Sequence, residues 1–293
     1  MQRILMLSLV LAVSLVLGVS SFTLFTPSTA ASEPFPACNR VDPTNRQLVT
    51  QGRQLFSDAH VFSQKQPFRA CITCHGGPAL TDNENHTIAP TGSAAVTFPR
   101  STPSLLQHLG QTAPYAWDGR AACLQRAAFG AITSPVESDG VVPATAQGQA
   151  QLDALAAYLL SLQPPAPLRN LDPQKVARGQ AVFTTKPCAS CHAGPAFTDR
   201  QLHNHNLGDG DPGAGLIGTG SQGEFDTPQL RGVRLSAPYF HNGRNGIPAD
   251  SATPVATEPR AALRQVVEFY NVQRNLQLTE QEKDDLVEFL MSL

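Results

Sequence analysis

Two short stretches, Cys71-Ile72-Thr73-Cys74-His75 and Cys188-Ala189-Ser190-Cys191-His192, decide how the rest of the chain can fold. Each has the pattern C-x-x-C-H, the attachment signature of c-type haem. Two thiols three residues apart lie on one face of a helical turn, where they can bond to the two vinyl groups of a porphyrin. The histidine that follows is then placed under the iron as its proximal ligand. The sequence therefore predicts two haems, attached by Cys71, Cys74, Cys188 and Cys191 and ligated by His75 and His192.

A C-x-x-C pair without the histidine also occurs in redox dithiols and in zinc sites. Neither of these sites requires a histidine directly after the second cysteine, and both copies here have one. We therefore expect two covalently bound c-type haems, with a dithiol and a zinc site as the alternatives.

The composition agrees with a helical, cofactor-filled protein. A length of 293 residues predicts about two domains. The net charge is −2 and no run of Lys or Arg occurs, so nothing supports a nucleic-acid partner. The 24 prolines and 22 glycines predict long irregular connections between short helices. We expect an all-α fold of two tandem cytochrome c-like haem domains.

The amino terminus has the features of a secretory signal. Arg3 precedes an apolar run from Ile4 to Val19, and the small-residue stretch Ser28-Thr29-Ala30-Ala31 follows. We expect residues 1–30 to be a signal peptide and the mature protein to be periplasmic. The alternative is an uncleaved anchor extending to Phe25, which would tether the protein to the membrane.

Two of the six cysteines lie outside the haem motifs. Cys38 and Cys123 would both lie in an oxidising compartment, where a disulfide between them can form. Sequence alone does not decide whether they meet. Residues 31–44 are expected to be an N-terminal arm, which such a bond would hold in place.

The two halves of the chain repeat one pattern. His86 and His203 lie at equal distances from the histidines of their motifs, since 86 − 75 = 203 − 192. The matching segments are residues 51–56 with 178–183, 77–82 with 194–199, 102–105 with 227–230, 113–115 with 237–239, and 155–162 with 286–293. We therefore expect the two haem domains to be related by an internal repeat.

A proline-rich segment separates the halves. Gln163-Pro164-Pro165-Ala166-Pro167 stops the preceding helix and predicts a stiff joint. We expect one domain at residues 45–165 and the other at residues 170–293. In the helix that closes the first domain, Leu155, Tyr158, Leu159 and Leu162 form an apolar stripe, which should pack across the helix at the front of that domain.

The ligand opposite each proximal histidine determines what each iron can do, and methionine is the usual ligand for electron carriage. The only methionines are Met1, Met6 and Met291; the first two lie in the signal and the third is expected to pack in the closing helix. Simple His/Met ligation is thus disfavoured. The other candidates are His60, His86, His108, His203, His205, His241 and Tyr270.

Several longer motifs point to one family. Residues 100–105, 115–120, 227–233 and 237–243 together resemble the bacterial dihaem cytochrome c peroxidase and MauG superfamily, over nearly all of the mature chain. The resemblance implies a peroxidatic haem in the N-terminal domain and an electron-transfer haem in the C-terminal domain. One departure is that the chain reaches its second haem motif without the longer insert typical of the peroxidases.

The resemblance also implies two functional residues in the N-terminal half. Trp117, the only tryptophan, corresponds to the family's tryptophan between the haems, and Glu137 corresponds to its distal acid. A carboxylate can move a proton from the inner to the outer oxygen of bound peroxide. Without the resemblance, Glu137 would be a solvated loop charge and Trp117 a core residue.

Tyr270 stands where peroxidases of this family carry a methionine ligand and MauG-like members carry a tyrosine. A tyrosine ligand would lower the reduction potential of the C-terminal haem. The alternative is that Tyr270 only ends a helix and that His203, His205 or His241 binds the iron. His241 is expected nearer the gap between the haems or their propionates than the iron, and His86 and His203 are expected to be ordinary hydrogen-bonded histidines.

A calcium ion between the domains is a further expectation from the resemblance. Ser101, Ser236 and Pro238 occupy the family positions that supply a calcium ion between the domains, but Ser101 replaces an asparagine.

The predicted function is an exported dihaem peroxidase that reduces hydrogen peroxide, with electrons passing from the C-terminal to the N-terminal haem. The donor would be a small redox protein, either a cytochrome c or a cupredoxin. One alternative is a MauG-like oxidase of protein side chains, and another is a non-enzymatic dihaem electron carrier.

Overall fold

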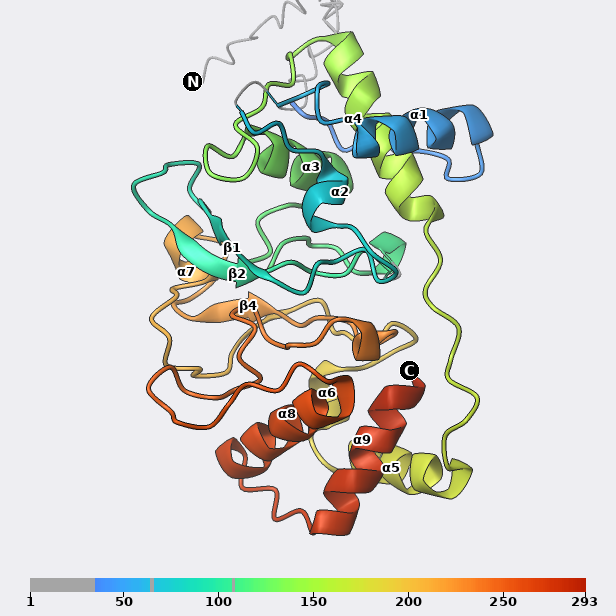
Figure 1. The fold of residues 1–293 in the computed structure, drawn as a ribbon, viewed down its shortest axis with the longest axis vertical. Coiled ribbons are helices and arrows are strands. Elements are labelled where there is room, and N and C mark those ends of the chain that lie inside the picture. Colours follow the sequence, from blue (N-terminus) through green and yellow to red (C-terminus); the bar gives the residue numbers. More distant parts are fainter. Residues whose placement is uncertain (1–34, 64–65, 107–108) are drawn as a thin grey trace, which may run out of the picture. The chain divides into compact units, whose positions relative to one another are not determined.

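The computed structural model describes residues 35–63, 66–106 and 109–293, which belong to one compact unit (Figure 1). The predicted signal peptide, the first residues of the arm and His108 lie outside the described residues. The α-helices are α1 (Arg46–Ser57), α2 (Cys71–Cys74), α3 (Leu124–Thr133), α4 (Ala146–Ser161), α5 (Pro173–Thr185), α6 (Cys188–Cys191), α7 (Ala214–Ile217), α8 (Pro259–Gln273) and α9 (Glu280–Ser292). Two 3-10 helices are η1 (Leu109–Gln111) and η2 (Val233–Leu235).

The expectation of an all-α fold needs a correction, because the described residues include two small antiparallel sheets. Strand β1 (Asn85–Ile88) pairs with β2 (Phe98–Ser101), and β3 (Leu202–Asn204) pairs with β4 (Glu224–Asp226). The strands are three or four residues long, which is too short for an alternating apolar pattern to identify them. They pair because the long connections must satisfy their backbone hydrogen-bonding groups.

The longer helices begin at residues that cap free backbone N–H groups. The side chains of Asn45 and Thr145 accept hydrogen bonds at the starts of α1 and α4. Asp172 caps α5 and is followed by Pro173 at the first helical position. Thr279 and Glu282 form a capping box at the start of α9.

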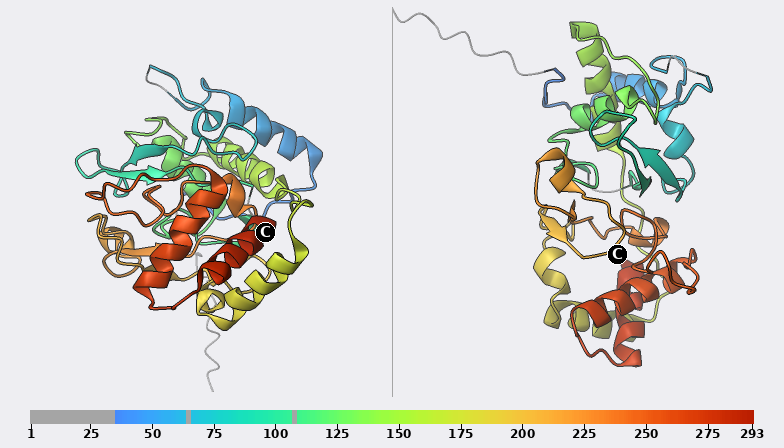
Figure 2. Two further views of the ribbon diagram at one scale, coloured as in Figure 1. Left: turned by 60° about the horizontal axis from the view of Figure 1, so that its bottom comes forward. Right: turned by 90° about the vertical axis from the view of Figure 1, so that its left-hand side faces the viewer.

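Each half is built on a pair of helices that cross very closely. A Cβ atom at Gly52 of α1 would lie 1.9 Å from the carbonyl oxygen of Ala154 in α4. A Cβ atom at Gly179 of α5 would likewise lie 1.9 Å from the carbonyl oxygen of Asp285 in α9. Only glycine allows this approach, and both pairs stay side by side in the views of Figures 1 and 2.

Two apolar cores lie beside these crossings. Leu155 and Leu159 of α4 are buried in the N-terminal core, and the ring of Tyr158 packs edge-on against Phe56 of α1 at 5.3 Å. The predicted stripe on α4 is therefore confirmed. Met291 is buried in the C-terminal core, as expected for a packing residue.

The connection between the halves has no helix or strand in residues 162–172, all of which the structure describes. The halves are joined instead by hydrogen bonds between distant segments. The backbone N–H of Ser101 donates to the carbonyl of His241 at 2.7 Å, and the Asn85 side chain donates to the carbonyl of Asn242 at 2.9 Å. The ends of the β1–β2 sheet therefore contact the C-terminal half directly.

Cys38 and Cys123 form a disulfide, which bonds the N-terminal arm to the residue before α3. The side chain of Gln149 in α4 makes two hydrogen bonds to the backbone of Ala37, and Gln125 donates to the carbonyl of Asn39 at 2.8 Å. The described part of the arm is thus fastened to α3 and α4.

Several contacts occur at matching positions of the two halves. The Thr81 hydroxyl donates to the carbonyl of Thr102 at 2.8 Å, and the Thr198 hydroxyl donates to that of Thr227 at 2.6 Å. Within residues 35–63, 66–106 and 109–293, no helix is long and apolar enough to span a membrane.

Candidate active site

The two C-x-x-C-H motifs form short helices, α2 and α6, that end at their histidines. The Nδ1 atom of His75 lies 3.2 Å from the carbonyl oxygen of Leu80, and that of His192 lies 3.0 Å from the carbonyl oxygen of Phe197. A carbonyl can only accept, so each Nδ1 carries the proton and each Nε2 is left for a metal. Burial lowers the pKa of both imidazoles, which favours the neutral form that binds iron.

Both motifs line one cavity of about 1330 Å³, which also reaches Trp117, Glu137 and Tyr270. A cavity of this size and mixed lining fits large flat cofactors. Burial raises the pKa of the Cys71 thiol to about 11 and raises that of Cys188 as well. Reactive dithiols require the opposite shift, so the motif cysteines suit haem attachment better than thiol exchange.

Glu137 lies in the turn after α3 and lines the same cavity as His75. The Arg69 guanidinium donates to the carbonyl of Glu137 at 3.0 Å and so fixes the backbone of this turn. Burial raises the pKa of the Glu137 carboxyl. A half-buried carboxyl of this kind can exchange a proton with a ligand in the cavity.

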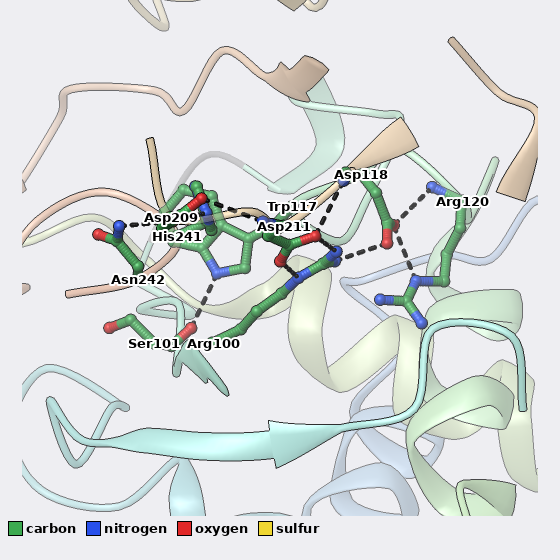
Figure 3. Close-up of polar contacts among 10 residues, drawn as sticks. Arg100, Ser101, Trp117, Asp118, Arg120, Asp209, Asp211, His241 and Asn242 are labelled. Atoms are coloured by element: carbon green, nitrogen blue, oxygen red, sulfur yellow. Dashed lines mark hydrogen bonds and ion pairs between the residues drawn. The ribbon is translucent and has the colours of Figure 1, made fainter. Parts of the chain in front are cut away.

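Trp117 lies where the two halves meet. Its indole N–H donates to the carbonyl of Ser101 at 2.8 Å (Figure 3). Its own carbonyl accepts a hydrogen bond from the N–H of Asp226, also at 2.8 Å. The indole ring is edge-on to His241 at 6.5 Å, and the His241 ring stacks on Phe225 at 3.6 Å. Trp117 is thus held by residues of both halves.

A buried network of charges surrounds the backbone on either side of Trp117 (Figure 3). Arg100 donates two hydrogen bonds to Asp211 of the C-terminal half and one to Asp118, the last at 2.6 Å. Asp118 also accepts from Arg120 at 2.8 Å. Because each charge in this network has a partner, burial of Arg100, Asp118 and Asp211 is tolerated, and Arg120 is half-buried.

His241 has a partner other than a metal. Its Nε2 lies 2.8 Å from Asp209, whose second contact is the Asn242 amide at 2.6 Å. Burial alone would raise the pKa of Asp209, but the hydrogen bond and charge of His241 lower it to about 2. The ring of His241 contacts Trp117 and Phe225, and its place relative to the haems stays a prediction.

Tyr270 of α8 lines the cavity and packs against His205 with ring centres 5.6 Å apart. Burial raises the pKa of Tyr270 and lowers that of His205 to about 4. Among the histidines that could replace Tyr270 as ligand, His203 is bound to Asp199 at 2.8 Å. His205 is different, because its buried Nδ1 has no hydrogen-bond partner within the described residues.

Two further histidines of the described residues, His60 and His86, have ordinary contacts. His86 lies 2.7 Å from Asp82, as His203 does from Asp199, so both are hydrogen-bonded as expected. His60 packs against Phe68 with ring centres 4.7 Å apart.

The calcium expectation remains a prediction. The carbonyl of Ser101 accepts the Trp117 indole N–H, and the Ser236 hydroxyl donates to the carbonyl of Val233 at 3.0 Å.

Sequence reasoning missed Asp226 of β4. Burial, with a smaller contribution from the charge of Asp199, raises the pKa of Asp226 to about 8, and its Oδ1 has no hydrogen-bond partner within the described residues. The internal repeat could have identified it, because Asp226 and Ser101 both precede a Thr-Pro pair.

Comparisons with known proteins agree with this geometry. Residues 46–186 match the family model described as di-haem cytochrome c peroxidase, and residues 176–293 match that of cytochrome c. The methylamine utilization protein MauG of Methylorubrum extorquens is 30% identical over 299 residues, covering 89% of this chain and 81% of the relative. The cytochrome c551 peroxidase of Nitrosomonas europaea is 27% identical over 307 residues, covering 90% and 85%.

A solved structure shows the same fold. The dihaem peroxidase of Burkholderia thailandensis superposes with a TM-score of 0.60 at 19% identity, over 87% of this chain and 89% of the other. Together with the matched family models, these similarities place the chain in the dihaem cytochrome c peroxidase and MauG family, as an oxidoreductase of the peroxidase type with two covalently bound c-type haems.

Proposed function

We propose that this protein is an exported dihaem peroxidase that reduces hydrogen peroxide to water with electrons from a small redox protein. The observation that carries the proposal is a single cavity that contains both haem motifs, Glu137 near the first motif and Trp117 where the halves meet. The family relatives named cytochrome c peroxidases support it.

Each motif would hold one haem. A haem iron with an open sixth position binds peroxide, whereas one with two protein ligands passes electrons. His75 and His192 would supply the proximal nitrogens, and their Nδ1 contacts with Leu80 and Phe197 keep the rings oriented. Tyr270 would supply the sixth ligand in the C-terminal half, which leaves the N-terminal half to react with peroxide.

Glu137 would act on the proton of the substrate. As a carboxylate it takes the proton from one peroxide oxygen, and it returns that proton to the other oxygen, which leaves as water. Overall, one peroxide, two electrons and two protons give two waters. Arg69 holds the backbone that presents this side chain to the cavity.

Electrons would enter at the C-terminal half and pass through Trp117. The support is the position of Trp117. Its indole N–H donates a hydrogen bond to Ser101, and its backbone carbonyl accepts one from Asp226. The contacts that recur in the two halves support an origin by duplication, with domains at residues 45–165 and 170–293.

The amino-terminal sequence supports export to the periplasm, where a cytochrome c or a cupredoxin could serve as donor. The test is turnover: purified holoprotein should oxidise a reduced cytochrome c or cupredoxin only when peroxide is added. Ferric EPR spectra before and after one-electron reduction should show one iron becoming open to ligands. Two six-coordinate irons that ignore peroxide in every redox state would contradict the proposal and indicate an electron carrier.

A second candidate function is MauG-like oxidation of protein side chains. Tyr270 favours it, because this tyrosine stands where the peroxidases have methionine and lies in the cavity on the side of the second motif. Reaction with peroxide without turnover of any reduced donor would favour this second function.

A further inference from the structure

Two residues at equivalent positions of the internal repeat hold Trp117 by hydrogen bonds. Ser101 and Asp226 each precede a Thr-Pro pair in the internal repeat. The Ser101 carbonyl accepts the indole N–H, and the backbone N–H of Asp226 donates to the Trp117 carbonyl, both at 2.8 Å. The N-terminal position thus carries a neutral hydroxyl and the C-terminal position a carboxyl.

One oxygen of the Asp226 carboxyl accepts no hydrogen bond from the described residues. Asp226 lines the cavity that contains both motifs, and this oxygen, Oδ1, is buried. Asp226 is half-buried, and a carboxylate with a buried oxygen that accepts no hydrogen bond is costly, so this group favours its protonated form. Burial is the main cause that raises the pKa of Asp226 to about 8, and the charge of Asp199 adds to it.

The charged groups around Asp226 are otherwise occupied. Asp199, in the loop before β3, is bound to His203 at 2.8 Å. In the segment of Trp117, Asp118 is bound to Arg120 and Arg100. Within the described part of the chain, no cation lies within ion-pair distance of Asp226. The neighbouring Arg and His side chains are already paired with Asp118 and Asp199, so they do not compensate the charge of an electron that arrives nearby.

We propose that Asp226 is a redox-linked proton site on the C-terminal side of Trp117. In the pH range where the Asp226 carboxyl is partly ionised, arrival of one electron from the donor protein at the C-terminal haem would draw one proton from solvent onto the Asp226 carboxylate, with formation of one O–H bond. When the electron leaves through Trp117, that O–H bond breaks and the proton returns to solvent. The net charge of this region is then unchanged by electron arrival, which matters because uncompensated charge is costly in a medium of low dielectric constant.

This inference rests on the proposed electron route, but its test does not need turnover. The midpoint potentials of both haems are measured by spectroscopic redox titration of the holoprotein between about pH 5 and pH 10, for the wild type and for Asp226→Asn. In the wild type, the potential of the C-terminal haem should fall with rising pH around the pKa of Asp226, by up to about 59 mV per tenfold change in proton concentration. Asp226→Asn should lose this component and leave the N-terminal haem unchanged.

Asp199→Asn tests the same inference independently. It also serves as the test if Asp226→Asn does not fold. Removing this negative charge lowers the pKa of Asp226, so the sloping range should move to lower pH while the slope is kept. An unchanged slope in Asp226→Asn, or an unchanged range in Asp199→Asn, would overturn the inference. Peroxide turnover is recorded in parallel. If turnover is absent but the potential of the C-terminal haem still depends on pH as described, the proposed function is wrong and the inference about Asp226 stands.

Discussion

Arg100 donates two hydrogen bonds to Asp211, at 2.9 and 3.0 Å, and thereby joins β2 of the N-terminal half to a loop of the C-terminal half. The two side chains are only 2% and 5% exposed. A bidentate pair fixes both distance and angle. Since Ser101 follows Arg100 and accepts the Trp117 indole N–H, this pair also sets where the indole lies between the halves.

Asp211→Asn should destabilise the protein strongly. It leaves the buried Arg100 with an incomplete set of partners, and breaking a buried pair typically costs about 3–5 kcal/mol. The free energy of unfolding is measured by denaturant titration of the holoprotein. Asp284→Asn is the matched control, because Asp284 is 65% exposed and its pair with Arg264, at 3.4 Å, is worth about 0–1 kcal/mol. Equal losses in the two variants would contradict the role given to Arg100 and Asp211.

Trp117→Phe should keep the fold and slow electron transfer between the halves. The variant loses the hydrogen bond to Ser101, so the expected loss of stability is only about 0.5–1.5 kcal/mol. Stopped-flow reduction of the C-terminal haem followed by transfer to the N-terminal haem measures the rate. Tyr115→Phe is the control, because it removes another aromatic hydrogen bond of the same loop, to the carbonyl of Leu109. A wild-type transfer rate in Trp117→Phe would remove Trp117 from the route.

Glu137→Gln should lower peroxide turnover by about 10²–10⁴-fold, the usual contribution of a general acid–base group. Both haem spectra should be unchanged, and Glu84→Gln, at an exposed position, should retain full activity.

The same residue predicts a pH dependence. Burial raises the pKa of Glu137, so the carboxylate that accepts the proton is lost at higher pH than for an ordinary glutamate. Turnover should therefore fall as pH falls through this raised pKa, and Glu137→Gln should lack that acid limb. A wild-type acid limb in the variant would show that another group titrates.

Tyr270→Met should raise the reduction potential of the C-terminal haem, because a methionine ligand favours ferrous iron more than tyrosine does. The potential and the low-spin ferric EPR signal are the measurements. Tyr239→Phe is the control, since Tyr239 is also buried in the C-terminal half but donates to the carbonyl of Val233. If His205 rather than Tyr270 binds the iron, Tyr270→Met leaves the signal unchanged.

Asp226→Asn should also change how stability depends on pH. The unfolded group has a pKa near 3.8 and the folded group one of about 8, so the folded state binds the extra proton between these values. Wild-type stability should therefore fall as pH rises from about 4 to 8, by about 1.4 kcal/mol per pKa unit at most, while the variant lacks this loss. Unfolding titrations at pH 5 and pH 9 compare the two proteins. If the two proteins differ in unfolding free energy by the same amount at pH 5 and at pH 9, Asp226 is ionised throughout this range and the prediction is wrong.

The sequence alone determined the features that are local in the chain. The cysteine and histidine spacing of the two motifs predicts haem attachment, because an α-helical turn places such residues on one face. The repeat predicted a helix pair in each half, and the structure has Gly52 against α4 and Gly179 against α9. The apolar pattern likewise predicted that Met291 packs in the core.

Only the tertiary structure decided which distant groups meet. The disulfide of Cys38 with Cys123, the pairing of Arg100 with Asp211 and the contact of His205 with Tyr270 join residues far apart in sequence, and no local spacing encodes them. The short strands escaped prediction because three or four residues show no clear period. Asp226 is the clearest case, because a carboxylate is ordinary in a sequence and becomes chemically distinctive only when the fold buries its Oδ1 without a hydrogen bond from the described residues.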